Sequence, residues 1–128
     1  MNKSHLNQIE RRQLTSKNGQ ELYSIVKSVS DAVSLSSLLI HFEELAPGNF
    51  SARPHSHTTK DEVFIITRGE GSLMTNGEAQ KVSEGEVISF EGTDEEVHVI
   101  QNTSESTLNY ISIATNPPDD TVNYKTEA

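Results

Sequence analysis

The amino-acid sequence predicts an all-β fold in which antiparallel strands form a small barrel or sandwich. The middle of the chain alternates short runs typical of strands with turn residues at close spacing, and most of these runs carry β-branched residues. No amphipathic stretch of about a dozen residues separates the runs, as the crossovers of a parallel sheet would require. A chain of 128 residues has the usual size of one compact domain, so we expect a single domain over residues 1–128.

The elements follow from the runs and the turns between them. Residues 1–14 could form a short helix or an edge strand, and the sequence does not choose between the two. Asn76-Gly77 suits the positive φ angles of a type I′ turn, so we expect a hairpin there, and Asn18-Gly19 is a candidate for another. Pro47-Gly48 is expected to end the strand before it. The runs that we expect to be strands are 22–29, 35–44, 63–67, 72–75, 79–82, 87–90, 97–101 and 108–114.

The end of the chain has a different character from the middle. From Asn116 onward the sequence reads NPPDDTVNYKTEA and contains two prolines, which cannot donate a hydrogen bond to a strand ladder. We therefore expect this tail to leave the barrel. The predicted barrel core spans about residues 20–115, with an N-terminal arm and a C-terminal tail on either side.

Composition and charge exclude several classes of partner. The formal net charge of -9 and the pI near 4.9 disfavour nucleic acid and anionic membrane surfaces, because binding to phosphates requires clustered Lys and Arg. The chain has no cysteine, so any transition metal must be held by nitrogen and oxygen. No apolar run approaches the roughly 20 residues of a membrane span, and the N-terminus lacks the apolar segment of a signal peptide. We expect a cytoplasmic protein.

The stretch that carries chemistry begins with His55-Ser56-His57. Side chains at positions i and i+2 of a strand point to the same face, so both imidazoles can be directed toward one point inside a barrel. Residues 58–61 would turn the chain and bring the Glu62 carboxylate beside the pair, and His98 would complete the set from a distant strand. By itself the His-x-His pattern is a weak signal, because two exposed loop histidines with an incidental Glu and His would give the same pattern.

Three imidazoles and one carboxylate would suit divalent iron, manganese, nickel, copper or zinc. If such an ion is octahedral, coordination positions remain open, and the ion can polarise a substrate oxygen or bind dioxygen there.

The candidate ligands belong to two wider groups of residues with a regular order and spacing. The first group is Gly48, His55, His57, Glu62 and Gly69, and the second is Gly85, His98 and Asn102. These groups resemble the first and second motifs of the cupin superfamily, and the likeness runs from about Leu35 to Thr115. The resemblance implies an antiparallel jelly-roll barrel, also called a double-stranded β-helix, with a divalent metal ion held by His55, His57, Glu62 and His98. The tail also looks like that of small single-domain cupins.

The sequence also departs from the family pattern. Glu91 stands where the second motif usually has proline, and the connection from Phe90 to Val97 is longer than usual. One extra residue separates Gly48 from His55. None of these changes removes a ligand, but the loop near the barrel mouth is expected to differ, and the sequence leaves open whether the acidic stretch 94–96 covers the pocket.

Other candidate pocket residues have a structural interpretation that is favoured over a functional one. Phe64 and Ile66 share the strand face of Glu62, and Ile100 shares that of His98, so they could line a pocket but are expected to pack in the core. His41 and Tyr110 are expected to be barrel residues with satisfied hydrogen bonds, and Arg53 is expected to be solvated. These three contact a ligand only in the alternative interpretation, and no catalytic residue is assigned.

The sequence leaves three classes of function open. The first is a metal-dependent enzyme, such as a dioxygenase, isomerase or decarboxylase, that acts on a small oxygenated substrate. The alternative is a non-catalytic module that binds or senses a small molecule, since one fold serves many functions. A storage or structural barrel comes third. The resemblance also implies a homodimer, and shared burial would suit a chain with only 33% hydrophobic residues.

Overall fold

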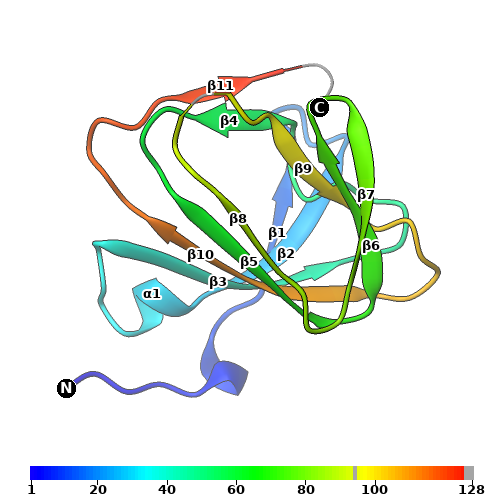
Figure 1. The fold of residues 1–128 in the computed structure, drawn as a ribbon. Coiled ribbons are helices and arrows are strands. Elements are labelled where there is room, and N and C mark those ends of the chain that lie inside the picture. The colour runs from blue at the N-terminus through cyan, green and yellow to red at the C-terminus, as the bar shows by residue number, and fades with distance from the viewer. Residues whose placement is uncertain (94, 126–128) are drawn as a thin grey trace.

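The computed structural model describes residues 1–93 and 95–125 and confirms the predicted all-β antiparallel jelly roll. Two sheets face each other, and every strand pairing within them is antiparallel (Figure 1). The six-stranded sheet has the order β1 (Arg12–Thr15), β2 (Leu22–Ser28), β3 (Leu38–Leu45), β10 (Leu108–Thr115), β5 (Glu62–Arg68) and β8 (Val87–Phe90). The five-stranded sheet has the order β11 (Val122–Tyr124), β4 (His55–His57), β9 (His98–Gln101), β6 (Glu70–Thr75) and β7 (Glu78–Ser83).

Each run predicted as a strand forms one, with ends that differ by up to three residues. Asn76 and Gly77 join β6 to β7 with φ angles of 49° and 83°, which confirms the predicted turn with two positive φ angles. The N-terminal residues contain both of the elements that the sequence could not choose between. Leu6–Gln8 form one turn of 3₁₀ helix, η1, and β1 is an edge strand that pairs with β2. A short helix, α1 (Val29–Ala32), follows β2.

The predicted course of the C-terminal tail is wrong. The chain after Asn116 does not leave the barrel but returns along β4 as strand β11 (Figure 1), with Val122 opposite His57 and Tyr124 opposite His55. Both prolines lie before the strand begins, so they remove no donor from this ladder. The final strand therefore borders the histidine pair.

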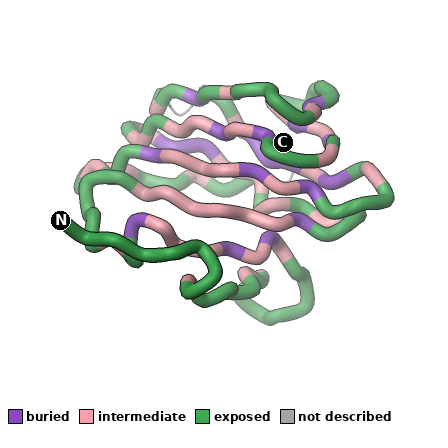
Figure 2. Tube along the Cα trace, turned by 90° about the horizontal axis from the view of Figure 1, so that it is seen from below, coloured by how far each residue is buried: buried purple, intermediate pink, exposed green. Residues whose placement is uncertain are grey.

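The core lies between the two sheets. Buried and half-buried positions alternate along β2, β5 and β6, and Figure 2 shows such alternation along the chain, as expected for strands with one face toward the core. Phe64, Ile66 and Ile100 pack in this core as predicted, and Tyr110, which is 1% exposed, is also part of it. The buried apolar cluster consists of Leu45, Phe64, Ile66, Leu73, Val82, Phe90, Ile100, Leu108 and Tyr110.

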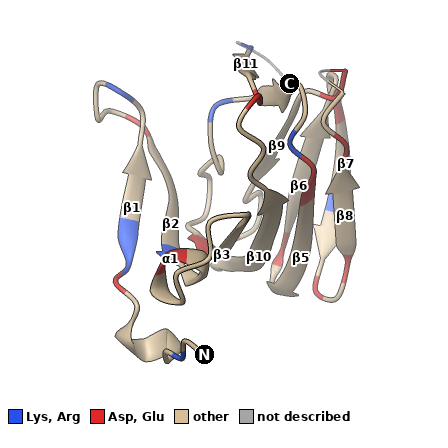
Figure 3. Ribbon diagram, turned by 90° about the vertical axis from the view of Figure 1, so that its left-hand side faces the viewer, with Lys and Arg blue, Asp and Glu red and all other residues tan. Residues whose placement is uncertain are grey.

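Lys and Arg are scattered among acidic residues in the side view of Figure 3 rather than gathered on one face. Within the described residues, no helix combines the length and the apolar character that a membrane crossing needs.

Candidate metal centre

The two sheets together bring the four predicted ligand residues to one place. β4 carries His55 and His57, while β9 begins with His98, and His55 and His98 are direct partners across the β4–β9 pairing. Glu62 opens β5 in the opposite sheet, after residues 58–61 have turned the chain. His57 and His98 are buried, and His55 and Glu62 are half-buried. The histidines are therefore not exposed loop residues.

The side chains converge on the Glu62 carboxylate. Its Oε1 lies 3.1 Å from Nε2 of His57 and 3.0 Å from Nε2 of His98. The potential ligand atoms of His55, Glu62 and His98 all lie within 4.8 Å of one another, and His57 adjoins this cluster through the shared Glu62 oxygen. The imidazole centroid of His55 is 5.0 Å from that of His57 and 5.0 Å from that of His98.

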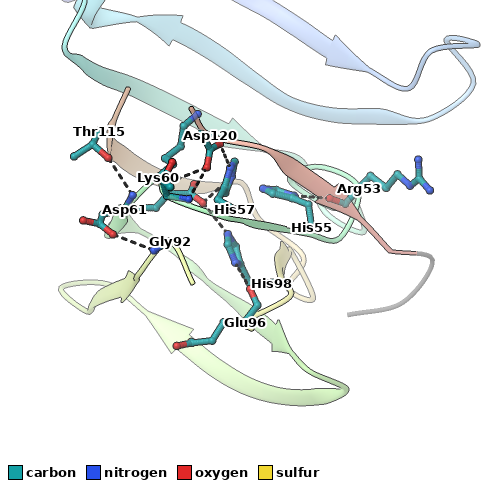
Figure 4. Close-up of polar contacts among 12 residues, drawn as sticks. Arg53, His55, His57, Lys60, Asp61, Gly92, Glu96, His98, Thr115 and Asp120 are labelled. Atoms are coloured by element: carbon teal, nitrogen blue, oxygen red, sulfur yellow. Dashed lines mark hydrogen bonds and ion pairs between the residues drawn. The ribbon is translucent and has the colours of Figure 1, made fainter. Parts of the chain in front are cut away.

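Local backbone contacts orient two of the imidazoles. Nδ1 of His55 lies 2.7 Å from the carbonyl oxygen of Arg53, and Nδ1 of His98 lies 3.0 Å from the carbonyl oxygen of Glu96 (Figure 4). A carbonyl oxygen can only accept a hydrogen bond, so both Nδ1 atoms carry a proton. Nε2 of each ring is therefore the nitrogen that would bind a metal ion, and at His98 the ion would replace the proton that Nε2 donates to the Glu62 carboxylate.

The third imidazole is oriented by a residue that sequence reasoning did not assign. Nδ1 of His57 donates to Oδ2 of Asp120 at 2.8 Å, and the Asp120 side chain is 8% exposed (Figure 4). Burial raises the pKa of Asp120, but hydrogen bonds from His57 and from the Thr59 and Lys60 amides outweigh it and lower the pKa to about 2. The signal available in the sequence was the Asp119-Asp120 pair, but its contact with His57 depends on the return of the tail.

Charges within the site depend on each other. Burial raises the pKa of Glu62, but hydrogen bonds from His57 and His98 outweigh it, and the net effect is a lowered pKa. Burial lowers the pKa of His57, whereas its bonds to Glu62 and Asp120 raise it, and the raising effects prevail. Burial is the largest cause of the lowered pKa of His55. A cation between these groups is therefore favoured electrostatically. Without a metal ion, the proton that Glu62 and Asp120 favour on His57 supplies a positive charge there.

The chemistry of this donor set fits a metal ion. Two of the inward Nε2 atoms lie around a carboxylate oxygen, and a third imidazole is adjacent. Nitrogen and oxygen donors of this kind suit divalent first-row transition metals. Four protein ligands around an ion that accepts six would leave positions for substrate oxygens.

A second polar cluster, also unassigned by the sequence analysis, lies on the inner face of the six-stranded sheet. The Glu43 carboxylate accepts hydrogen bonds from the Ser24 hydroxyl at 2.6 Å and from the Tyr110 hydroxyl at 3.0 Å. Both donors are buried, while Glu43 is half-buried. Burial raises the pKa of Glu43, and the nearby Glu62 charge raises it further. The available signal was strand alternation, which places Glu43 on the same face as His41 and Leu45.

The remaining candidate residues take structural places. Arg53 is exposed, as predicted, and its Cζ lies 5.1 Å from the centroid of the Tyr124 ring. His41 is half-buried, and burial is the largest cause of its lowered pKa. Asp94 lies outside the described residues, so the question of a covering acidic loop can be addressed only for Glu95 and Glu96, which are exposed.

Comparisons with known proteins place the fold. The family model that describes the cupin domain matches residues 41–114. A sugar phosphate isomerase of the cupin superfamily from Silicibacter pomeroyi superposes with a TM-score of 0.85 at 24% identity, over 96% of this chain and 81% of that chain. A putative sugar phosphate isomerase from Acidithiobacillus ferrooxidans gives a TM-score of 0.84 at 24% identity, over 92% of this chain and 75% of that chain.

A predicted oxalate decarboxylase from Thermotoga maritima is also similar. Its TM-score is 0.72 at 20% identity, over 88% of this chain and 97% of that chain. At these identities the likeness concerns the fold alone. No curated protein matches the sequence.

Proposed function

Because this chain belongs to the cupin family, we propose that it binds a divalent transition metal ion through His55, His57, Glu62 and His98. The observation that carries the proposal is the approach of two Nε2 atoms, from His57 and His98, to a single oxygen of Glu62. Iron, manganese, nickel, copper and zinc are the candidate ions, since all of them accept this donor set.

We further propose that the chain is an enzyme that acts on a small oxygenated substrate. The bound ion would supply Lewis-acid chemistry by polarising a substrate oxygen. Isomerisation or decarboxylation is favoured over oxygen chemistry by the names of the similar structures, two sugar phosphate isomerases and a predicted oxalate decarboxylase. A non-catalytic module that binds or senses a small molecule is the alternative.

Glu43 is the residue that we propose to exchange a proton with the substrate. Strand alternation supports this role, because Glu43 lies on the same face of β3 as the buried Leu45, and the Glu62 charge is close enough to raise the pKa of Glu43. Its carboxylate therefore faces the interior from the same sheet as Glu62. The raised pKa makes this carboxylate a stronger base than an ordinary one.

The metal proposal is tested first by elemental analysis of protein purified without a chelator or an affinity tag. Close to one equivalent of a transition metal per chain supports it, and a matched preparation of His57→Ala should lose that metal. A chain that stays free of metal, and that binds none of the five ions when they are added, contradicts the proposal.

The enzyme proposal is tested with the metal-loaded chain and a panel of sugar phosphates and small carboxylic acids, together with oxygen consumption. Turnover that falls at least 100-fold in Glu43→Gln, with metal content unchanged, supports both the enzyme and the role of Glu43. Glu44→Gln is the matched control, since Glu44 lies on the opposite face of β3. Saturable binding without turnover would favour the alternative module.

We also propose a homodimer. β1 is the outermost strand of the six-stranded sheet, so within the described residues one of its edges has no partner strand. Leu22 in the neighbouring strand is 52% exposed and would be covered by a partner. Light scattering that gives twice the mass of one chain supports the dimer, and a monomeric mass contradicts it.

A further inference from the structure

The three imidazoles of the candidate metal centre differ in how far away their Nδ1 acceptor lies in the sequence. His55 and His98 each donate to a carbonyl two residues before them, so their own strands fix their orientation. His57 donates to Asp120, which lies 63 residues later in the chain. The orientation of one proposed ligand therefore depends on the docking of the C-terminal segment.

Asp120 is built into this position by several contacts. While Oδ2 accepts from His57, Oδ1 accepts from the backbone amides of Thr59 at 3.0 Å and Lys60 at 2.9 Å. The next residue, Thr121, donates its amide to the Thr58 hydroxyl at 2.9 Å, and its carbonyl accepts from the Thr58 amide at 3.1 Å. These contacts hold the C-terminal segment against the turn that separates His57 from Glu62.

We propose that Asp120 is a positioning residue that keeps the proton of His57 on Nδ1 and thereby couples metal binding to the docking of residues 117–124. This inference rests on the metal site proposed above. A carboxylate that accepts from a ligating histidine fixes the ring and its tautomer, and its loss typically lowers metal affinity about 10- to 100-fold.

Coupling of this kind acts in both directions. If the docked segment raises metal affinity by some factor, a bound metal ion must stabilise docking by the same factor, because the two equilibria share one thermodynamic cycle. A metal ion at the centre should therefore reduce the opening of β11, and an undocked tail should weaken metal binding.

Asp120→Asn is the decisive variant because the two carboxylate oxygens do different things. The Asn carbonyl oxygen can replace Oδ1 and keep both backbone amides satisfied, so we expect the segment to stay folded. The Asn Nδ2 then faces Nδ1 of His57 and can only donate, which forces the imidazole proton onto Nε2. A protonated Nε2 cannot bind a metal ion.

Zinc affinity is measured by competition with a chromophoric chelator. We expect Asp120→Asn to bind zinc about 10- to 100-fold more weakly than the unmodified chain. Asp119→Asn is the matched control, because the contact found for the Asp119 carboxylate is with the Thr59 hydroxyl at 3.3 Å rather than with a histidine. Its zinc affinity should stay within about twofold. Equal affinities in Asp120→Asn and the unmodified chain would overturn the proposal.

Nitrogen-15 spectra of the imidazoles, recorded without metal in alkaline buffer, report the tautomer directly. In the unmodified chain a neutral His57 has a carboxylate at each ring nitrogen, Asp120 at Nδ1 and Glu62 at Nε2. We therefore expect Asp120→Asn to raise the Nε2–H fraction of His57, while His55 stays unchanged. An equal fraction in both chains would overturn the positioning role. Because this readout needs no metal, a raised Nε2–H fraction in a chain that binds no zinc would support the role of Asp120 and contradict the metal proposal alone.

Hydrogen exchange at the Thr58 and Thr121 amides reports docking. Zinc should slow exchange at both in the unmodified chain and in Asp119→Asn, and should slow it less in Asp120→Ala, which lacks both carboxylate oxygens. If zinc binds to the unmodified chain but leaves these amides unchanged, the coupling is refuted although the metal site stands.

Discussion

The barrel interior has a histidine end, around His55, His57, Glu62 and His98, and an apolar end, around Leu45, Ile100 and Leu108. The two ends are stabilised by different interactions, and β9 runs from one to the other. At its first residue, His98 joins a cluster of imidazoles and carboxylates, whereas two residues later Ile100 packs against an apolar core. Leu45 and Leu108 in that core are fully buried. At the histidine end, described buried polar side-chain atoms all have hydrogen-bond partners. The comparison indicates that apolar burial stabilises the fold at one end, which leaves the other end free to hold charges for function.

The largest expected effect comes from removing bulk at the apolar end. Leu108→Ala should lower the free energy of unfolding by about 2–5 kcal/mol, because it leaves a cavity where no solvent reaches. Metal content per folded chain should not change. Urea denaturation with elemental analysis checks both expectations. Val87→Ala, at a position that is 65% exposed, should change the unfolding free energy by no more than about 0.5 kcal/mol.

The converse change is made at the histidine end. His55→Ala should lower zinc affinity by more than about 100-fold, since it removes a proposed ligand, and that factor corresponds to about 2.7 kcal/mol. The metal-free chain should lose no more than about 1 kcal/mol of unfolding free energy, because the bond to the Arg53 carbonyl is a single neutral contact. Calorimetric zinc titration and urea denaturation measure the two quantities.

His41→Ala is the matched control for that substitution, as His41 is a half-buried barrel histidine on β3. Its zinc affinity should remain within about twofold of the unmodified chain. If His41→Ala weakens zinc binding as much as His55→Ala does, zinc binding does not distinguish the proposed ligands from another barrel histidine, and the ligand assignment is wrong.

A smaller effect on stability and on zinc affinity is expected at Gly92, which lies against the turn that contains Thr59 and Lys60. A Cβ added at Gly92 would lie 2.5 Å from the Lys60 amide nitrogen and 2.6 Å from the Thr59 Cα. Gly92→Ala must therefore push the turn that donates to Asp120, at a cost of about 1–3 kcal/mol. Zinc affinity should fall together with stability. Thermal unfolding and zinc titration test this, and a variant with unchanged values would show that the loop yields without moving the turn.

The smallest effect concerns pH in the metal-free chain. The raised pKa of His57 contributes stability that is fully present below its ordinary value of 6.5 and is lost as pH rises through the raised value. The difference in unfolding free energy between the chain and His57→Ala should therefore shrink as pH rises from mildly acidic to alkaline. The lowered pKa values of His41 and His55 act with the opposite sign, but they are present in both chains.

Zinc should reverse this pH dependence, because zinc binding displaces the His57 proton and strengthens as pH rises, whereas His57→Ala is expected to lose the metal. Urea denaturation at several pH values, with and without zinc, measures it. A difference between the two metal-free chains that grows toward alkaline pH would contradict the sign of the His57 shift.

Local features of the sequence were enough to predict most of the strands. Strand alternation and the Asn76-Gly77 turn depend on neighbours a few residues apart, and the structure agrees with both. The same local rule placed His55 and His57 on one face. It failed for the tail, because whether residues after Asn116 join a sheet depends on an open edge at β4 that local sequence does not reveal.

Asp120 and Glu43 escaped prediction for a related reason. Each carboxylate has its role through partners that are distant in sequence: His57 is 63 positions from Asp120, and Tyr110 is 67 positions from Glu43. The neighbouring sequence does not distinguish an acidic residue with such a contact from the other acidic residues of a negatively charged chain, and most acidic residues are solvated.

By itself, the sequence determined the all-β class and most of the strands, because alternation and turn chemistry act over short distances. The four side chains proposed to hold an ion were identified through the resemblance of their spacing to the cupin motifs. Only the tertiary structure decided that the last strand returns to β4, that Asp120 orients His57, and that Glu43 faces the interior from the sheet that carries Glu62. These outcomes depend on which strand edges meet when the two sheets close, and contacts between residues far apart in the chain are not encoded in any local pattern.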